Sequence, residues 1–360
     1  MAKSKENLEI KELEFDSEGM YVIDGTDPIE NKTISTGSLG LDILTGGIGS
    51  GVVQLWGPDG IGKTTLLLIM GGEFQKFYNY KFVRVYLHAT EGRINRKLEK
   101  MAPNLKMVTE SEEDLTQDEK GKIIPAPIFR MSRPKSGEKL FNGILKTLKQ
   151  DKVKFFHIID SIDGIQSEVN DNKTFSDAEK TASTATLLTR FLKEASAYAN
   201  HYGHIVAFTH QVRDKINQGG MSHVSGVGKQ KAGGHAIDHY SNLRLGLEKL
   251  WTDLYIRENP SDNHSKVIGH IMSMKLEKVS NSGNVHSKAS VPFIYDHGID
   301  HEREIATLAD GYGLIQKKGA WYALDDKNIA QGYNKLIEYL KSNKDIAERL
   351  EKEIKKMVGI

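Results

Sequence analysis

The segment GPDGIGKTTLLLIM, residues 57–70, continues directly from the apolar run GVVQLWG at 51–57. Glycines precede a Lys-Thr-Thr triplet and leucines follow it, so we expect a strand, a tight glycine-rich turn and a helix in that order. The spacing G-x(4)-G-K-[ST] is typical of loops whose backbone N–H groups surround the phosphates of a nucleotide. A chance glycine turn ahead of a buried helix is the alternative, but four specified positions and both flanking segments agree with a phosphate loop. The segment therefore predicts a nucleoside triphosphate site.

Apolar, β-branched runs of the same kind recur along the chain and predict further strands at 81–89, 154–161 and 204–211. Between the last two, apolar residues within 177–203 recur at helical spacing, namely Leu187, Leu188, Phe191 and Leu192. Strands that alternate with helices favour an α/β fold with a mainly parallel twisted sheet flanked by helices.

Composition narrows the class of protein without naming a partner. The 360 residues suffice for one large domain with an appendage or for two domains, and 38% hydrophobic with 27% charged residues indicate a soluble globular chain. Because 49 Lys and Arg are balanced by 48 Asp and Glu, nucleic-acid binding cannot be inferred from the net charge. The absence of cysteine excludes disulfides and thiolate metal sites. No apolar run is long enough for a signal peptide or a membrane span, so we expect no membrane partner and a cytoplasmic location.

The phosphate loop predicts the residues that hold the nucleotide and its metal. Lys63 is expected to neutralise the β- and γ-phosphate oxygens, and Thr64 to place its hydroxyl on Mg²⁺. Asp160 ends the apolar run FFHIID and is the expected carboxylate for the Mg²⁺ water shell. ATP and Mg²⁺ are thus the expected cofactors. The predicted cofactor-binding residues of this segment are Gly57, Pro58, Asp59, Gly60, Ile61, Gly62, Lys63, Thr64 and Thr65.

Two polar residues at strand ends are candidates for the reaction itself. Glu91 follows the strand expected at 81–89 and is positioned to polarise an attacking water, although a solvated strand-end carboxylate is the alternative. Gln211 closes the strand expected at 204–211, where an amide can hydrogen-bond a terminal phosphate and transmit its loss to the next segment. An ordinary polar residue at the end of a strand is the alternative for Gln211. We therefore assign catalytic roles to Glu91, Lys63 and Gln211.

The segment 212–234 is rich in glycine and carries four cations, with no acidic residue after Asp214. Such a segment can lay backbone amides and cations along a phosphodiester chain. A solvated loop with incidental lysines is the alternative. The candidate DNA-binding residues are Arg213, Lys215, Lys229, Lys231, Gly233 and Gly234.

Other segments carry weaker patterns. The stretch 111–138 is polar, contains three of the eight prolines and is expected to be a surface excursion from the core. His235 and His239 have helical metal-ligand spacing, but no third ligand is evident, so no zinc site is expected. Residues 269–280 are expected to form a strand with Lys275 and Lys278 near its end, where lysines usually solvate an edge. The segment from Asn328 to the last residue predicts two amphipathic helices.

Several segments together resemble the RecA-type homologous recombinases, and the resemblance covers nearly the whole chain in order. They are ISTGSLGLDILTGGIGSGVVQLWGPDGIGKTTLLL (34–68), HIIDSIDGI (157–165), FTHQVRDKI (208–216), AGGHAIDHYSNLRLGL (232–247), MKLEKVSNSG (274–283) and DHGIDHEREIATLADGYGLIQKKGAWYAL (296–324). The resemblance implies an N-terminal polymerisation element at 1–33, a RecA-like P-loop NTPase core at 34–295 and a small α/β C-terminal subdomain at 296–360. The diverged loops, and His210 where cellular members usually carry Asn, make the bacteriophage recombinases the most similar group. The cytoplasm is then that of a bacterium or of a phage-infected host.

The resemblance implies a DNA-dependent ATPase that forms a head-to-tail helical filament on single-stranded DNA and pairs that strand with homologous double-stranded DNA. In this family Glu91 corresponds to the catalytic glutamate and Gln211 to the γ-phosphate sensor. The first and second DNA-binding loops become 163–180 and 212–234, respectively. Lys275 and Lys278 fall where family members reach the nucleotide of the neighbouring subunit, and single-strand-binding and mediator proteins are implied as accessory partners.

Some positions depart from the family pattern. Ser280 stands where a second lysine acts across the subunit interface, Met221 is the nearest large apolar residue where RecA has an aromatic in its second loop, and Asp238 with His239 replaces a basic-aromatic pair. Two other functions therefore stay open from the sequence alone. One is a hexameric helicase built on the same core, and the other is a recombinase paralogue or mediator with little ATPase activity.

Overall fold

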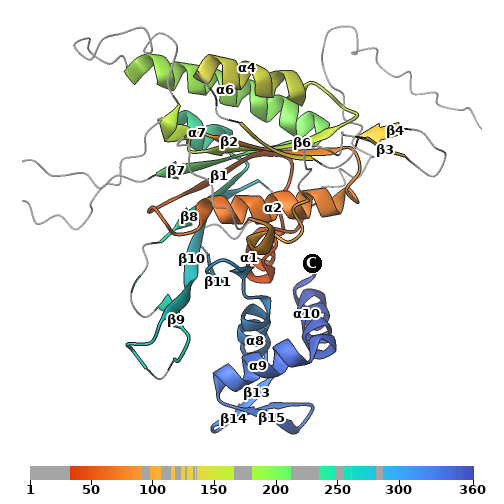
Figure 1. Ribbon diagram of the computed structural model, residues 1–360, viewed down its shortest axis with the longest axis vertical. Helices are drawn as coiled ribbons and strands as arrows, with labels where there is room; N and C mark the ends of the chain where they lie inside the picture. The colour runs from red at the N-terminus through yellow and green to blue at the C-terminus, as the bar shows by residue number, and fades with distance from the viewer. Residues whose placement is uncertain are drawn as a thin grey trace, which may run out of the picture. The chain divides into compact units, whose positions relative to one another are not determined.

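The structure is a computed structural model, in which the described residues are 33–90, 98–106, 115–117, 123–125, 128–132, 134, 136–165, 181–211, 235–248, 251, 254–260, 262–280 and 287–360 (Figure 1). The compact unit that contains them begins at Thr33. Apart from Thr33, the expected polymerisation element at 1–33 lies outside the described residues, and its extent stays a prediction.

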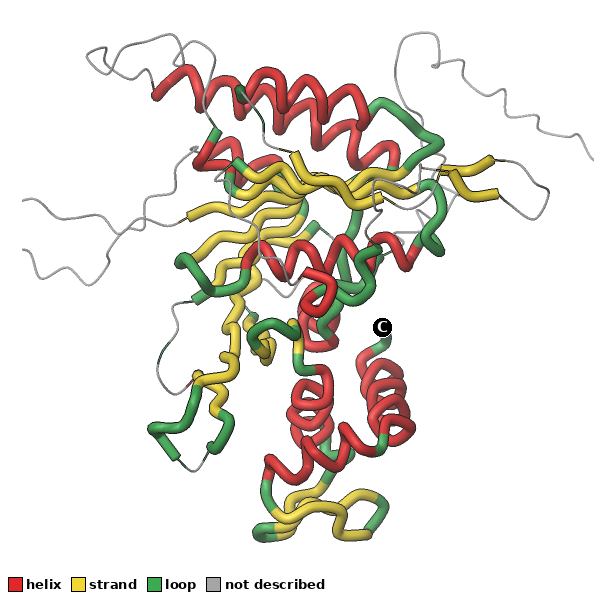
Figure 2. Tube along the Cα trace, viewed as in Figure 1, coloured by secondary structure: helices red, strands yellow, loops and turns green. Residues whose placement is uncertain are grey.

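A large sheet forms the centre of the described residues (Figure 2). It has ten strands in the order β12-β11-β10-β8-β1-β7-β6-β2-β5, with β9 beside β10. The strands from β8 to β5 are parallel to one another, and β9 to β12 add antiparallel pairs at the other edge. The expected α/β fold with a mainly parallel sheet is thus confirmed. The strands of this sheet are β1 (Gly51–Gly57), β2 (Val83–Ala89), β5 (Ile128–Ser132), β6 (Lys154–Asp160), β7 (Ile205–Gln211), β8 (Leu243–Leu247), β9 (Tyr255–Arg257), β10 (Val267–Val279), β11 (Lys288–Ile294) and β12 (Gly298–Ile299).

Helices cover both faces of the sheet, as Figure 1 shows. On one face α1 (Leu39–Thr45) and α2 (Lys63–Phe77) bury leucines and isoleucines against β1, β2 and β10. On the other face α4 (Gly137–Leu148), α6 (Thr181–Tyr202) and α7 (His235–Tyr240) pack on β1, β6 and β7. Because both faces are covered, the central strand β1 is buried at every position, which explains why its sequence is apolar apart from Gln54.

The prediction that the whole of 111–138 is a surface excursion is wrong. The short strands β3 (Leu115–Gln117) and β4 (Ile123–Pro125) pair with each other, but β5 joins the main sheet in parallel with β2. Helix α4 then begins at Gly137 under the cap of Ser136. Prolines bracket β5 at Pro125 and Pro134, and an edge strand tolerates such flanks because one side of its backbone makes no ladder. The prolines, which favoured a loop in the sequence, therefore lie on either side of a strand.

The C-terminal part has a hydrophobic cluster of its own. Helix α8 (His301–Gly311) leads into the three-stranded antiparallel sheet β13 (Gln316–Lys318), β14 (Trp321–Leu324) and β15 (Lys327–Gln331). The two predicted amphipathic helices follow as α9 (Tyr333–Ser342) and α10 (Lys344–Val358), and both bury leucines in this cluster. The cluster also includes Leu39 of α1, so this part packs on the first helix of the core. The subdomain boundary at residue 296 stays a prediction.

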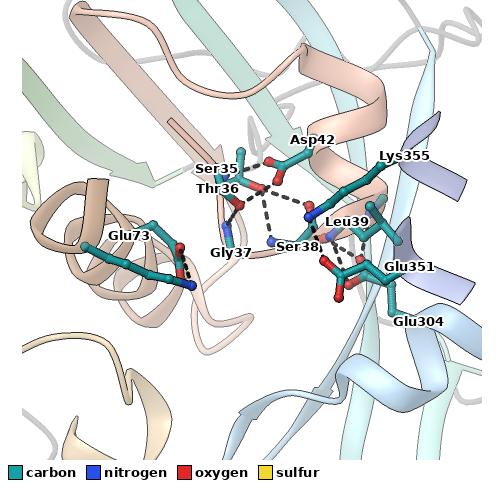
Figure 3. Close-up of polar contacts among 12 residues, drawn as sticks. Ser35, Thr36, Gly37, Ser38, Leu39, Asp42, Glu73, Glu304, Glu351 and Lys355 are labelled. Carbon is teal, nitrogen blue, oxygen red and sulfur yellow. Dashed lines mark hydrogen bonds and ion pairs between the residues drawn. The ribbon is translucent and has the colours of Figure 1, made fainter. Parts of the chain in front are cut away.

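A buried carboxylate marks that junction (Figure 3). Glu304 of α8 is 2% exposed, and its carboxylate accepts hydrogen bonds from the backbone N–H groups of Leu39 and Gly40, each at 3.0 Å, and from the Ser38 hydroxyl. Burial raises the pKa of Glu304, while these hydrogen bonds act in the opposite direction. Nearby, Asp42 accepts from the Ser35 hydroxyl at 2.6 Å. The start of α1 is therefore held by a side chain that comes from the other end of the chain.

A chain of polar groups lies between the sheet and α4. His88 of β2 and His157 of β6 are joined between Nε2 and Nδ1 at 3.0 Å, and the outer nitrogens contact the hydroxyls of Ser132 and Thr147 at 2.6 and 2.8 Å. Because Thr147 donates its proton to the Ile144 carbonyl, it accepts from Nε2 of His157, and the direction of every other bond follows with both rings neutral. Burial lowers the pKa of His88 to about 4, and it also holds the pKa of His157 well below its ordinary value.

Candidate functional site

The phosphate loop, residues 57–64, connects the end of β1 to the start of α2 at the centre of the sheet. Gly57 is required by packing, since a Cβ at this position would lie 2.7 Å from the Leu247 carbonyl oxygen of the neighbouring strand. Gly60 and Gly62 have φ of +72° and +97°, which side chains rarely adopt. Gly62 is also the N-cap residue of α2 and has no side chain with which to cap it. These glycines therefore give the loop a tight turn directly before a helix start, which is the arrangement that an anion site requires.

Lys63 is the buried cation of this loop. Its Nζ donates to the carbonyl oxygens of Gly57 at 2.9 Å and of Pro58 at 2.7 Å, and it lies 3.8 Å from the Asp59 carboxylate. The side chain is only 8% exposed. Because weak carbonyl acceptors hold it inside the loop, the ammonium is placed where phosphate oxygens can replace those acceptors.

Asp160 joins the loop to the next strand of the sheet. One of its carboxylate oxygens accepts from the Thr64 hydroxyl of α2 at 2.8 Å, and the other accepts from the Thr209 hydroxyl of β7 at 2.6 Å. A carboxylate beside a hydroxyl is a donor set that suits Mg²⁺, which in proteins usually keeps waters and phosphate oxygens as its other ligands. Among the described residues there is no group of three or more His, Asp or Glu that could hold a metal ion without such help. Thr64 and Asp160 thus fit a Mg²⁺ that arrives with a nucleotide.

Gln211 lies at the end of β7, two residues beyond Thr209, and its backbone N–H donates to Asp163 Oδ2 at 2.8 Å. Asp163 follows β6 in a short 3-10 turn, Ile162–Gly164. Asp163 is the first residue of the segment expected to be the first DNA-binding loop, and Gln211 directly precedes the segment expected to be the second. Their hydrogen bond therefore ties the starting points of the two segments together, beside the carboxylate of Asp160.

Of the two predicted lysines of β10, Lys278 contacts α7. Lys278 donates from Nζ to the carbonyl oxygens of Asp238 at 3.1 Å and His239 at 2.6 Å, so it caps the last turn of α7. Lys275 is half-buried and lies opposite Gly246 in the ladder with β8. Asp238 forms an ion pair with Arg244, whose Nε lies 2.8 Å from Glu277 of β10. Within this chain Lys278 therefore supports α7, and a contact with a neighbouring subunit's nucleotide stays a prediction.

Several predicted site residues lie outside the described residues, namely Glu91, Arg213, Lys215, Lys229, Lys231, Gly233 and Gly234. Most of the segment 163–180 lies outside them as well. Sequence reasoning missed Thr209 and Asp163 as partners within the site. Thr209 could have been found from strand alternation, because it lies two residues before Gln211 and shares its face of the strand.

No helix among the described residues has the length and apolar character needed to cross a membrane.

Comparison with known proteins agrees with this geometry. The RecA C-terminal domain family matches residues 303–359, which include most of α8 and all of α9 and α10. Protein RecA from Caulobacter sp. (strain K31) is 28% identical over 338 residues, which cover 91% of this chain and 82% of the relative. Protein RecA from Haemophilus ducreyi (strain 35000HP / ATCC 700724) is 26% identical over 357 residues, which cover 96% and 83%, respectively. The chain is therefore similar to RecA-type recombinases over most of its length.

Similarity to RecA thus extends through the phosphate loop, the strands behind it and the C-terminal part, in agreement with the resemblance inferred from the motifs. Protein RecA from Mesomycoplasma hyopneumoniae (strain J / ATCC 25934 / NCTC 10110) is 26% identical over 96% of this chain and 91% of its own length. A particular likeness to bacteriophage recombinases stays a prediction.

Proposed function

We propose that this RecA-type protein binds and hydrolyses ATP while polymerised head to tail on single-stranded DNA, and that the filament pairs the strand with homologous duplex DNA. The single observation that carries the proposal is the bridge made by Asp160. Its carboxylate joins Thr64 of the phosphate loop to Thr209 of β7, the strand that leads through Gln211 into the second DNA-binding loop.

The bridge provides a route from the nucleotide to DNA. Bound Mg²⁺ supplies charge neutralisation at the phosphate oxygens. Thr64 and Asp160 would hold it, so their mutual hydrogen bond must rearrange when the nucleotide arrives. Thr209 donates to the same carboxylate. The rearrangement therefore changes a hydrogen bond of β7, two residues before Gln211. The Gln211–Asp163 hydrogen bond passes it to the start of the first loop as well.

The roles of the remaining residues follow the same scheme. Lys63 exchanges its carbonyl partners for phosphate oxygens and stabilises charge in the transition state. Glu91 orients the attacking water. Arg213, Lys215, Lys229 and Lys231 contact the DNA backbone, so binding is independent of base sequence and weakens with salt. A head-to-tail contact is heterologous, and it builds an open helix when the rotation between subunits does not close a ring.

The test combines ATP hydrolysis with negative-stain imaging of the full chain. Single-stranded DNA is expected to stimulate phosphate release, and helical filaments are expected with single-stranded DNA and a non-hydrolysable ATP analogue. A strand-exchange assay with homologous duplex is expected to yield joint molecules, and heterologous duplex to yield none. Closed rings under all conditions, or hydrolysis that ignores DNA, would contradict the proposal.

The loop lysines are tested separately. Replacing Lys229 and Lys231 with Ala is expected to weaken single-strand binding and to flatten its salt dependence, because two phosphate contacts are lost. A matched loss of two charges at the exposed Lys146 and Lys152 serves as the control. Equal DNA affinity in both double variants would remove the second loop from the DNA interface.

A further inference from the structure

A histidine lies buried against the tip of the phosphate loop. His270 belongs to β10, is 1% exposed, and has its Nε2 at 3.2 Å from the carbonyl oxygen of Ile61. Its ring rests between Phe293 and Tyr295, with centroids 5.8 and 5.5 Å away. Two aromatic neighbours thus hold the ring edge toward the loop.

The direction of the hydrogen bond is unambiguous, because a carbonyl oxygen only accepts. Nε2 of His270 therefore carries the proton and donates. Burial lowers the pKa of His270, so the ring is neutral and its Nδ1 is an acceptor. Among the described residues this Nδ1 has no hydrogen-bond partner. Packing alone would favour an apolar side chain at such a buried position. The hydrogen bond to the Ile61 carbonyl therefore explains why a histidine occupies it.

Holding the Ile61 carbonyl also orients the next N–H group. The peptide unit between Ile61 and Gly62 is trans, so its C=O and N–H point in opposite directions. With the oxygen turned toward β10, the Gly62 N–H is turned away from β10, into the loop. Met272 supports the same side, because its Sδ lies 3.1 Å from where a Cβ of Gly62 would be. Gly62 has no side chain that would prevent this peptide from rotating, so an outside contact has to hold it.

Lys63 and His270 therefore hold different carbonyl groups of one loop. Lys63 holds Gly57 and Pro58, but it has to leave them in order to meet phosphate oxygens. His270 lies outside the loop, so the exchange at Lys63 does not require its bond to Ile61 to break. This bond can therefore keep the tip of the loop in place while the lysine moves.

We propose that His270 is a positioning residue for the triphosphate: by holding the Ile61 carbonyl it keeps the Gly62 N–H directed at the phosphates. This inference rests on the proposed nucleotide function. It assigns to β10 a role at the phosphate loop of its own chain.

The experiment compares variants of the full chain that differ in one donor. His270→Gln can place an amide N–H near the former Nε2, whereas His270→Asn reaches only as far as Nδ1 and His270→Leu has no donor. Affinity for a fluorescent ATP analogue is expected to fall about tenfold in the Leu and Asn variants, the loss typical of one misplaced hydrogen-bond donor, and to stay within about threefold of the parent in the Gln variant. Because Gln and Asn are both polar, their comparison does not depend on the Leu variant folding.

The matched control is His204→Leu. His204 is also buried, and its Nε2 bonds the Gln150 carbonyl at 2.8 Å, away from the phosphate loop. This variant is expected to lower the melting temperature and to leave ATP affinity unchanged. Equal ATP affinity in the Gln and Asn variants, or an unaltered affinity in all three, would overturn the role of His270. Failure of the parent protein itself to bind ATP would instead overturn the proposed function.

Discussion

Helices α1 and α2 both begin with a turn that presents backbone N–H groups, but they use different partners. At α1 the hydroxyl of Ser38 caps Leu41 N at 3.2 Å, and Glu304 accepts from Leu39 and Gly40 (Figure 3). At α2 the cap is Gly62, which has no side chain, and a buried lysine takes the place of the carboxylate.

The difference separates a structural joint from a ligand site. The first turn of a helix carries a partial positive charge and unpaired N–H groups, so either start attracts an anion. At α1 the chain supplies that anion itself, and the start becomes part of the contact between core and C-terminal part. At α2 glycine and lysine leave the N–H groups and the positive charge to an anion from outside. The same local physics thus stabilises the fold at one helix and provides function at the other.

Removing the cation of α2 should have the largest effect on activity. Lys63→Ala is expected to lower DNA-stimulated ATP hydrolysis at least about 100-fold, because the loop loses the charge that stabilises the transferring phosphate. Lys76→Ala, at the exposed end of the same helix, is the control and should hydrolyse ATP normally. Sustained ATP hydrolysis in the Lys63→Ala variant would show that the start of α2 is not the ligand site that distinguishes it from the start of α1.

Acid should destabilise the fold through two of its buried histidines. His88 and His204 each have a pKa lowered to about 4 by burial, whereas unfolded histidine titrates near 6.5. The unfolded chain therefore binds more protons between these values, and stability is lost as the pH falls from about 6.5 to 4. Each histidine accounts for about 3 kcal/mol of this loss. Urea unfolding at pH 7, 6, 5 and 4 measures it, and His88→Gln should reduce the loss whereas the exposed His264→Gln should not.

Removing the anion of α1 should affect stability and leave the nucleotide alone. Glu304→Ala strands two backbone N–H groups and a hydroxyl in a buried junction, and is expected to cost about 2–3 kcal/mol in urea unfolding. Glu304→Gln keeps one acceptor oxygen and should cost less. ATP affinity is expected to remain within about twofold of the parent in both variants. A parallel fall of stability and ATP affinity would mean that the two helix starts are coupled.

The smallest effect is expected at the cap of α1. Ser38→Ala should cost about 1 kcal/mol, the usual contribution of an N-cap hydroxyl. Ser136→Ala removes the corresponding cap from α4 and is the control. Because Ser38 also donates to Glu304, its loss should matter less in the Glu304→Ala background, whereas the loss of Ser136 should be additive with it. Additive behaviour of Ser38 and Glu304 would contradict a shared joint.

The sequence predicted the residues whose roles depend on positions close to them in the chain. The phosphate loop depends on glycines, a lysine and a threonine within eight positions, and its flanking strand and helix have strong periodic patterns. Local backbone preference and local chemistry coincide there, so the loop, the strands around it and the α/β class follow from the amino acids alone.

Only the tertiary structure decided which distant side chains meet. Thr209 reaches Asp160, His270 reaches Ile61 and Glu304 reaches Leu39 across 49, 209 and 265 positions of sequence. The edge strand β5 was likewise hidden, since its prolines are tolerated only because no strand follows on its outer side among the described residues. Pairings of this kind arise from the order of strands in the sheet and from the packing of helices on it. A single sequence records neither, and for that reason Thr209 and His270 could be placed beside Asp160 and Ile61 only in the folded chain.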